Sequence, residues 1–270
     1  MNKETKRKIL TCVIGTVFTL SFCFLFEGKS VMTQAKPENA VFLPVITYKN
    51  ISAKENGYTV TREQFEKDLA FLKEKGYNSV VARDLVSFTM GLSELPENPV
   101  LITFDGGYRS FLTEAFPILE KYNTKAVVNI VGEYTDIFSK DVPKEDKNVR
   151  LCWEEVKYLH YSPFVEIGNN SYSFYDENKN PTKTQVKEDV LRLQQLMAEN
   201  IYNISLVFSY PHGFYSKETE KVINELGFKV TLLETEGKNY ITKDKRSLFN
   251  LKRYERKASD NTAEFFEKIM

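Results

Sequence analysis

Residues 95–108 read LPENPVLITFDGGY and join a proline-marked turn to a strand that ends in an acidic residue. Pro96 and Pro99 bracket the turn, and the apolar run from Val100 to Phe104 is typical of a buried strand. Asp105 stands at the end of that strand and is followed by two glycines. An aspartate in this place is a candidate general base or metal ligand, or a residue that only caps the next turn. Because the strand delivers Asp105 to the edge of a sheet, we favour a chemical role.

Strand-like runs alternate with helical patterns on both sides of this stretch and continue almost to the end of the chain. The expected strands are residues 41–48, 79–82, 99–104, 126–131, 165–168, 205–209 and 230–233. The expected helices are residues 61–75, 111–122, 153–161, 184–199 and 216–226. This alternation predicts one α/β domain, residues 41–270, with a parallel sheet covered by helices, most simply a β/α barrel. In such a barrel the loops that follow the strands should converge on the site.

The N-terminus has the pattern of a targeting segment. Lys3, Lys6, Arg7 and Lys8 precede an uncharged, mostly apolar stretch from residue 9 to residue 26. Its length is long for a signal-peptide core and near the lower limit for a membrane span. We therefore expect residues 1–27 to be a signal anchor or a signal peptide, followed by a polar spacer over residues 28–40. The domain is expected outside the cytoplasmic membrane and attached to it by the N-terminal helix, or alternatively secreted.

The overall composition limits the classes of partner and of cysteine site that we expect. The 37 basic and 37 acidic side chains cancel, which removes the electrostatic drive toward nucleic acid, so we expect no nucleic-acid partner. Three scattered cysteines are too few for a disulfide framework or a Cys-x-x-Cys metal site. We assign no chemistry to them.

Several motifs occur in order along this pattern of strands. They are PVITY at 44–48, the stretch 58–76, the stretch 95–107, EIGNNS at 166–171 and FSYPHG at 208–213. Together they resemble the polysaccharide deacetylase family, also called the nodulation-factor-deacetylase domain or carbohydrate esterase family four. The resemblance covers nearly the whole chain after Val41. It implies a distorted (β/α) barrel of the polysaccharide deacetylase type and metal-dependent removal of acetyl groups from N-acetylated sugars.

The family's metal site is largely missing from this chain. In the family's T-F-D-D-G motif the first Asp activates water and the second binds the metal, and an H-[ST]-x-x-H motif supplies two further ligands. Here the first Asp is kept as Asp105, whereas Gly106, Asn170 and Phe174 stand at the three ligand positions. Gly106 and Phe174 offer no ligand atom, and an amide oxygen is a poor ligand for zinc-like ions. We therefore expect no metal and no other cofactor, although the family norm is a divalent metal such as zinc.

The third motif and the aromatic residues around it are the candidate glycan contacts. In the family this motif directs a backbone N–H toward the acetyl oxygen, which makes Tyr210, Pro211, His212 and Gly213 candidate substrate-binding residues. Tyr108 follows the two glycines and can stack on a sugar ring. The alternative interpretation of these aromatics is ordinary packing of the core and rim. Two further departures from the family are Lys49, where many relatives have His, and the lack of any histidine after His212.

The preferred functional hypothesis is a membrane-anchored, extracytoplasmic pseudoenzyme that has lost metal-dependent deacetylation and binds cell-wall glycan or a partner. The first alternative is an active deacetylase of peptidoglycan, chitin-like chains or poly-N-acetylglucosamine with an unrecognised ligand set. A scaffold without sugar binding is the third hypothesis, favoured if side chains fill the groove. Metal content distinguishes the first two.

Overall fold

The computed structural model describes residues 39–52, 59–140, 149–173, 181–213 and 215–270. Residues Pro37–Met270 form one compact unit. The expected signal segment, most of the expected spacer, and Phe174 lie outside the described residues. Among the described helices, none has the length and apolar character needed to cross a membrane.

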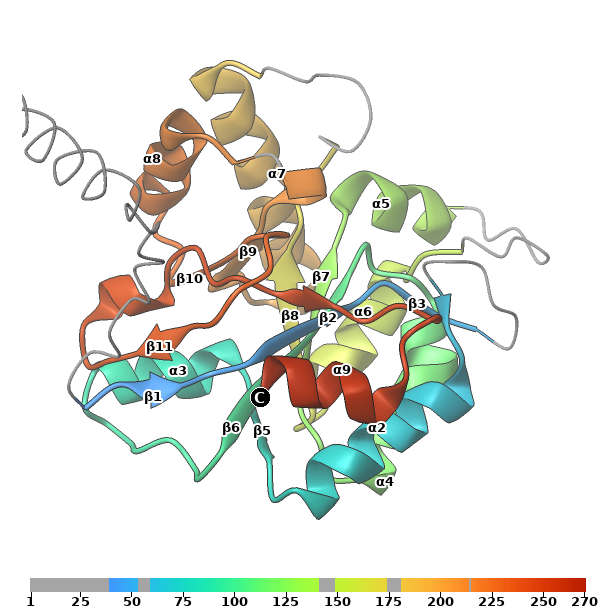
Figure 1. Cartoon of the computed structure of the whole chain (residues 1–270). Coiled ribbons are helices and arrows are strands. Elements are labelled where there is room, and N and C mark those ends of the chain that lie inside the picture. Colours follow the sequence, from blue (N-terminus) through green and yellow to red (C-terminus); the bar gives the residue numbers. More distant parts are fainter. Residues whose placement is uncertain (1–38, 53–58, 141–148, 174–180, 214) are drawn as a thin grey trace, which may run out of the picture. The chain divides into compact units, whose positions relative to one another are not determined.

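An eight-stranded sheet forms the centre of this unit (Figure 1), and all of its strand pairs are parallel. The strand order is β10-β9-β8-β7-β6-β2-β12, and β5 also pairs with β6. The strands are β2 (Val45–Tyr48), β5 (Asn78–Val80), β6 (Pro99–Asp105), β7 (Ala126–Ile130), β8 (Val165–Asn169), β9 (Val207–Ser209), β10 (Val230–Leu232) and β12 (Tyr254–Glu255). The sheet is curled: an isolated bridge joins Leu232, in the strand at one edge, to Leu251, which comes just before the strand at the other edge. The chain is therefore an α/β fold built on a curled parallel sheet.

Helices cover the outer face of the curled sheet (Figure 1). The α-helices are α2 (Arg62–Glu74), α3 (Ala82–Thr89), α4 (Phe116–Lys121), α5 (Gly132–Lys140), α6 (Trp153–His160), α7 (Lys183–Ile201), α8 (Lys217–Glu225) and α9 (Thr262–Ile269). Short helical turns lie at Phe111–Ala115, Pro211–Gly213 and Lys245–Leu248. Two small sheets complete the fold: β1 (Val41–Phe42) with β11 (Tyr240–Ile241), and β3 (Asn50–Ile51) with β4 (Thr59–Val60).

The alternation of side chains along the strands separates the core of one face of the sheet from that of the other. On β6, Leu101 belongs to the cluster of the inner face, whereas Val100 and Ile102 belong to the cluster under the helices. All seven residues of β6 are buried, as expected of a central parallel strand covered on both faces. The same alternation places Thr103 and Asp105 on the inner face, so the strand aims its last acidic side chain into the curl of the sheet.

The structure departs from the expected elements in several places. The expected strand 41–48 is interrupted at Leu43 and Pro44, because proline has no N–H for a ladder and the Leu43 N–H donates instead to the Asn239 carbonyl, at 3.0 Å. The elements α3, α5, α9 and β12 were not expected at all. The other expected strands and helices are present with boundaries shifted by a few residues.

Candidate functional site

The candidate site lies where the C-terminal ends of the parallel strands meet, and Asp105 at the end of β6 is its centre. Asn129 of β7 donates from Nδ2 to Asp105 Oδ1 at 2.7 Å. Ser209 of β9 donates from Oγ to the two carboxylate oxygens at 3.3 and 3.2 Å. Arg253, just before β12, donates from Nη1 to Oδ1 at 2.9 Å and from Nη2 to Oδ2 at 2.7 Å. Side chains from three other strand segments therefore converge on the carboxylate at the end of β6.

This carboxylate is closed off and fully occupied by donors. Asp105 is 3% exposed, and Arg253 has no exposed surface. Burial alone acts to raise the pKa of the Asp105 carboxyl, but the Arg253 guanidinium and the Asn129 and Ser209 donors outweigh it and lower the pKa below its ordinary value. Asp105 is thus held ionised by a bidentate partner, an arrangement that anchors strands and leaves little basicity for accepting a proton.

Sequence reasoning missed three site residues, Asn129, Ser209 and Arg253, and Arg253 makes the most extensive contacts of the three. Its Nε donates to the Leu233 carbonyl at 2.7 Å, and Nη1 lies 3.3 Å from the hydroxyls of Thr47 and Thr103. The guanidinium therefore crosses the inside of the curl and ties β12 to β2, β6 and β10. The only available signal was a basic residue within the strand-like run 251–254, and that signal does not reveal a partner 148 positions away.

The first metal-ligand position cannot easily hold a ligand side chain. Gly106 has φ = +91°, a conformation that side chains rarely adopt, and a Cβ placed there would lie 3.0 Å from Cε2 of the Tyr108 ring. The Gly106 N–H donates to the Asn129 carbonyl at 3.0 Å. A side chain at this position would therefore be strained and would crowd the Tyr108 ring.

The second position is occupied by an amide with a structural partner. Asn170 is fully buried, and its Nδ2 donates to the Ser209 carbonyl at 2.9 Å. Phe174, at the third position, lies outside the described residues. Within the described part of the chain, no three His, Cys, Asp or Glu side chains are grouped as a metal site would need. The residues at Gly106 and Asn170 therefore do not fit the divalent metal that the family uses.

Tyr108 lies beside Gly106 and is part of a stack of aromatic and guanidinium groups. The Arg150 guanidinium carbon is 3.5 Å from the centre of the Tyr108 ring and 4.9 Å from the centre of the Tyr134 ring. Tyr108 and Arg150 are half-buried and also form an isolated β-bridge. Tyr108 thus lies beside the strand end that carries Asp105, and its role as a substrate contact stays a prediction.

Side chains of the third motif, residues 208–213, point to both faces of the sheet. Ser209 points to the inner face, so Tyr210 points to the outer face, where it is 1% exposed and packs against Phe208 and Tyr215. Pro211 is buried, whereas His212 and Gly213 are exposed and have φ of +45° and +67°. Of the predicted substrate contacts, Tyr108, His212 and Gly213 are accessible and Tyr210 is not.

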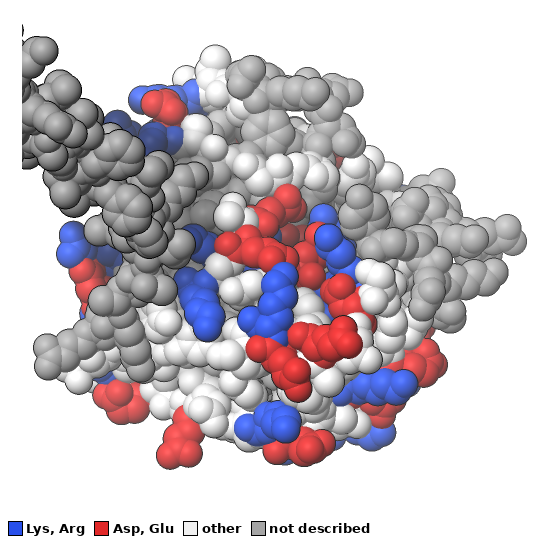
Figure 2. Space-filling view, in the orientation of Figure 1, with Lys and Arg blue, Asp and Glu red and all other residues white. Residues whose placement is uncertain are grey.

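A charged rim borders the same strand ends. Lys49, directly after β2, lies 3.3 Å from a Glu255 carboxylate oxygen and 3.9 Å from one of Glu234. Burial acts to lower the pKa of Lys49, but Glu255 and Glu234 outweigh it and raise the pKa, so the ammonium group is charged. Figure 2 shows acidic and basic side chains interspersed across the middle of this face.

Comparisons with known proteins agree on one family. A family model described as polysaccharide deacetylase matches residues 93–231, a little more than half of the chain. The Bacillus subtilis (strain 168) protein YxkH is 25% identical over 202 residues, which cover 75% of this chain and 68% of YxkH. The poly-beta-1,6-N-acetyl-D-glucosamine N-deacetylase of Escherichia coli (strain K12) is 34% identical over 127 residues. That match covers 45% of this chain but only 18% of the enzyme.

A solved structure supports the fold. The Streptococcus pyogenes deacetylase PplD in complex with acetate superimposes with a TM-score of 0.73, covering 86% of this chain and 99% of its own. The two sequences are 18% identical, so this likeness concerns the fold alone. It matches the curled parallel sheet with covering helices described above.

Proposed function

Because this chain belongs to the polysaccharide deacetylase family, we propose that it is a glycan-binding member that does not carry out metal-dependent deacetylation. The ligand class is an N-acetylated polysaccharide, since the relative from E. coli is named for poly-β-1,6-N-acetylglucosamine. The accessible residues Tyr108, His212 and Gly213 are the proposed contacts. Tyr108 stacks on a sugar face, and the exposed backbone at 212–213 donates to a sugar oxygen.

The observation that carries the loss of catalysis is the state of Asp105 and its neighbour. A water-activating base needs an accessible oxygen and a suitable pKa, whereas both Asp105 oxygens already accept hydrogen bonds from buried donors. Gly106 contributes no ligand side chain, and a side chain placed there would crowd the Tyr108 ring. Without a metal, neither water activation nor polarisation of the acetyl carbonyl is available.

An active deacetylase with another ligand set is the second candidate. Asp105 is retained, and the rim carboxylates Glu234 and Glu255 lie near the same strand ends. Oxygen ligands of this kind suit hard cations better than zinc. Metal analysis of the purified protein separates this candidate from the first.

We also propose that the N-terminal segment holds this domain outside the cytoplasmic membrane. The support is the sequence alone: basic residues 3–8 followed by the uncharged stretch 9–26. Cell fractionation should recover the full-length chain with the membranes. Recovery of a soluble mature form that begins near Lys36 would contradict the proposal.

Glycan binding is tested by isothermal titration of the full-length chain with an N-acetylglucosamine tetramer. Tyr108→Ala should weaken binding about five- to tenfold, because an aromatic–sugar stack contributes about 1 kcal/mol or more. Tyr161→Ala is the matched control, since Tyr161 is 66% exposed and directly follows the end of α6. Wild-type protein that binds no tetramer would contradict the proposed function, and equal weakening by both variants would contradict the role of Tyr108.

A further inference from the structure

A pocket of about 310 Å³ lies next to the charged rim and is not part of the site described above. The loop after β10, the end of β12, the loop 256–261 and helix α9 form its walls. It is lined by Glu236, Glu255, Lys257, Ser259, Asp260, Asn261, Glu264, Phe265 and Lys268. This volume is at the lower end of the range for small-ligand pockets, which suits a single sugar unit of a longer chain.

The pocket is connected to the mouth of the sheet through one residue. Glu255 lines the pocket, and its carboxylate also pairs with Lys49 at 3.3 Å. A glycan that crosses the rim at Lys49 would therefore meet this pocket with its neighbouring sugar. The pocket and the rim therefore share Glu255.

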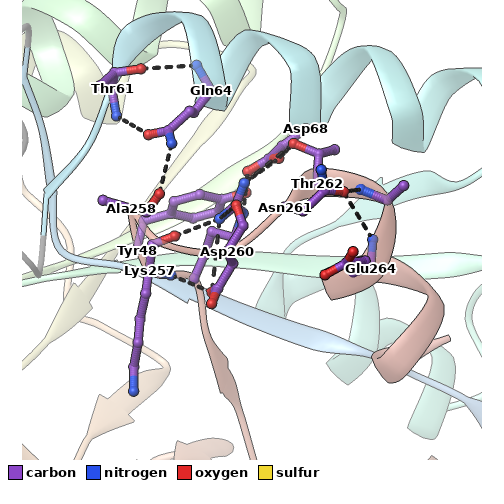
Figure 3. Close-up of polar contacts among 12 residues, drawn as sticks. Tyr48, Thr61, Gln64, Asp68, Lys257, Ala258, Asp260, Asn261, Thr262 and Glu264 are labelled. Carbon is purple, nitrogen blue, oxygen red and sulfur yellow. Dashed lines mark hydrogen bonds and ion pairs between the residues drawn. The ribbon is translucent and has the colours of Figure 1, made fainter.

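The loop that forms one wall is rigidly held, as Figure 3 shows. Arg256 is 1% exposed and donates to both oxygens of the buried Asp68, at 2.9 and 3.1 Å. The same guanidinium donates to the Asp260 carbonyl at 2.9 Å, and Thr262 donates from Oγ1 to Asp68 at 2.8 Å. Gln64 holds the loop from α2 by donating to the Ala258 carbonyl at 2.8 Å. A wall fixed in this way loses little entropy when it binds a ligand.

The charged side chains that line the pocket have a negative net charge. Four acidic residues face two lysines in the pocket, and one negative charge remains even if Lys49 is added as the partner of Glu255. Lys268 pairs with Glu236 at 3.0 Å. Among the described residues, the Glu264 side chain has no ion pair or hydrogen bond that would neutralise it.

The lining also combines the groups that recognise a sugar. Phe265 forms an apolar part of the lining, and because it is only 7% exposed and packs against Phe266, it offers a small apolar contact. Ser259, Asn261 and the carboxylates surround it with hydrogen-bonding groups that suit sugar hydroxyls. Acceptors dominate, so a ligand that carries extra N–H donors and a positive charge is favoured over a neutral acetamide.

We propose that this pocket is a second glycan subsite that binds an amino sugar with a free ammonium group, next to an acetylated sugar at the mouth. The proposal rests on the proposed function, and it narrows the ligand to partly de-N-acetylated polysaccharide. Glu264 is the specificity-determining residue, because its carboxylate is the one available to pair with the ammonium group.

The test is isothermal titration of the full-length chain with a glucosamine tetramer and, separately, with an N-acetylglucosamine tetramer. We expect tighter binding of the glucosamine tetramer, and weakening of that binding as salt rises. Glu264→Gln should weaken the glucosamine tetramer roughly fivefold and leave the acetylated tetramer unchanged. The control is Glu154→Gln, because Glu154 is also an exposed glutamate in the first turn of a helix but does not line the pocket.

The outcomes separate this proposal from the proposed function. If the protein binds the acetylated tetramer equally well or better, or if the two variants behave alike, the subsite proposal is wrong and the proposed function stands. If it binds neither tetramer, both are wrong. Circular dichroism on Glu264→Gln confirms that any loss of binding is not a loss of folding, since a first-turn glutamate contributes only about 0.3–1 kcal/mol to a helix.

Discussion

At the scale of single residues, the pair Asp105 and Arg253 explains both the stability and the chemistry of the site. A buried carboxylate is tolerated only with a partner, and here the partner is a fork of two N–H donors at 2.9 and 2.7 Å. The aspartate that the motif suggests as a base is in this way part of the framework that joins the strands.

Removing the arginine should therefore be costly. Arg253→Met leaves the Asp105 carboxylate buried without a counter-ion and should lower the free energy of unfolding by roughly 3–5 kcal/mol, measured by urea denaturation. The double variant Asp105→Asn/Arg253→Met should be more stable than Arg253→Met, because no bare charge remains. Arg62→Met is the control, since Arg62 makes an exposed pair with Glu114 that contributes at most about 1 kcal/mol. A double variant at least as unstable as Arg253→Met would contradict this account.

The lowered pKa of Asp105 leads us to predict how the stability of the fold depends on pH. The folded chain holds this carboxyl ionised below its ordinary pKa, so its contribution to stability is complete above the unfolded pKa of about 4 and is lost as pH falls toward the folded value. Wild-type protein should lose stability between pH 5 and pH 3 more steeply than Asp105→Asn, in urea titrations at each pH. Parallel curves would show that Asp105 is not a lowered-pKa group.

Reversion of the metal positions is a further test at this scale. Gly106→Asp, Asn170→His and Phe174→His together should create zinc affinity that no single change creates, because zinc needs about three protein ligands. The structure adds an obstacle: φ of +91° at Gly106 and the adjacent Tyr108 ring should make Gly106→Asp cost about 1–2 kcal/mol. Titration with zinc measures the affinity. A folded triple variant without affinity would show that the backbone no longer directs these side chains to one point.

At the scale of elements, a buried ion pair helps to position helix α9. Arg256 and Asp68 have no exposed side-chain surface and connect the segment after β12 to α2. Their hydrogen bonds to Thr262 and to the Asp260 carbonyl position the start of α9, as Figure 3 shows. The C-terminal helix is thus secured by polar contacts as well as by the packing of Phe71 on Phe266.

Breaking that pair should loosen one element first. Arg256→Met should lower the free energy of unfolding by roughly 3–5 kcal/mol, because it leaves the Asp68 carboxylate buried without a counter-ion. Hydrogen exchange should accelerate in residues 262–269 more than in α7, which does not contact the pair. The control is again Arg62→Met, which should change neither quantity appreciably. Uniform acceleration across all helices would indicate a global rather than a local role.

A comparison of the expected and observed elements shows which features the sequence could predict. The alternation of strands and helices predicted the parallel sheet, and the position of Asp105 at the end of β6 is confirmed, because both depend on local periodicity. Arg253 was missed because its role arises only from contacts between segments distant in sequence. The direction of Tyr210 could have been predicted: side chains alternate along a strand, so an inward Ser209 requires an outward Tyr210. The two-residue strand β12 is too short to leave a periodic signal.

At the scale of the whole molecule, the fold matches that of the family, whereas the residues at the strand ends differ from the family's motifs. The chain keeps the curled parallel sheet and the order of the motifs, whereas the strand ends now carry a neutralised carboxylate, an aromatic ring and an amide. Because a fold alone does not fix a function, the proposal of glycan binding depends on the residues that the surface around the mouth exposes. We place glycan binding there and in the acidic pocket beside it.

The most direct test of this account measures metal and activity on one sample of the full-length chain. Elemental analysis after purification without chelator, with and without added zinc, cobalt or nickel, should find well below one equivalent of bound metal. The same sample, incubated with acetylated poly-β-1,6-N-acetylglucosamine oligomers, should release no acetate above the buffer control. Near one equivalent of tightly held metal, together with acetate release that a chelator abolishes, would contradict the account and establish an active deacetylase with a ligand set of its own.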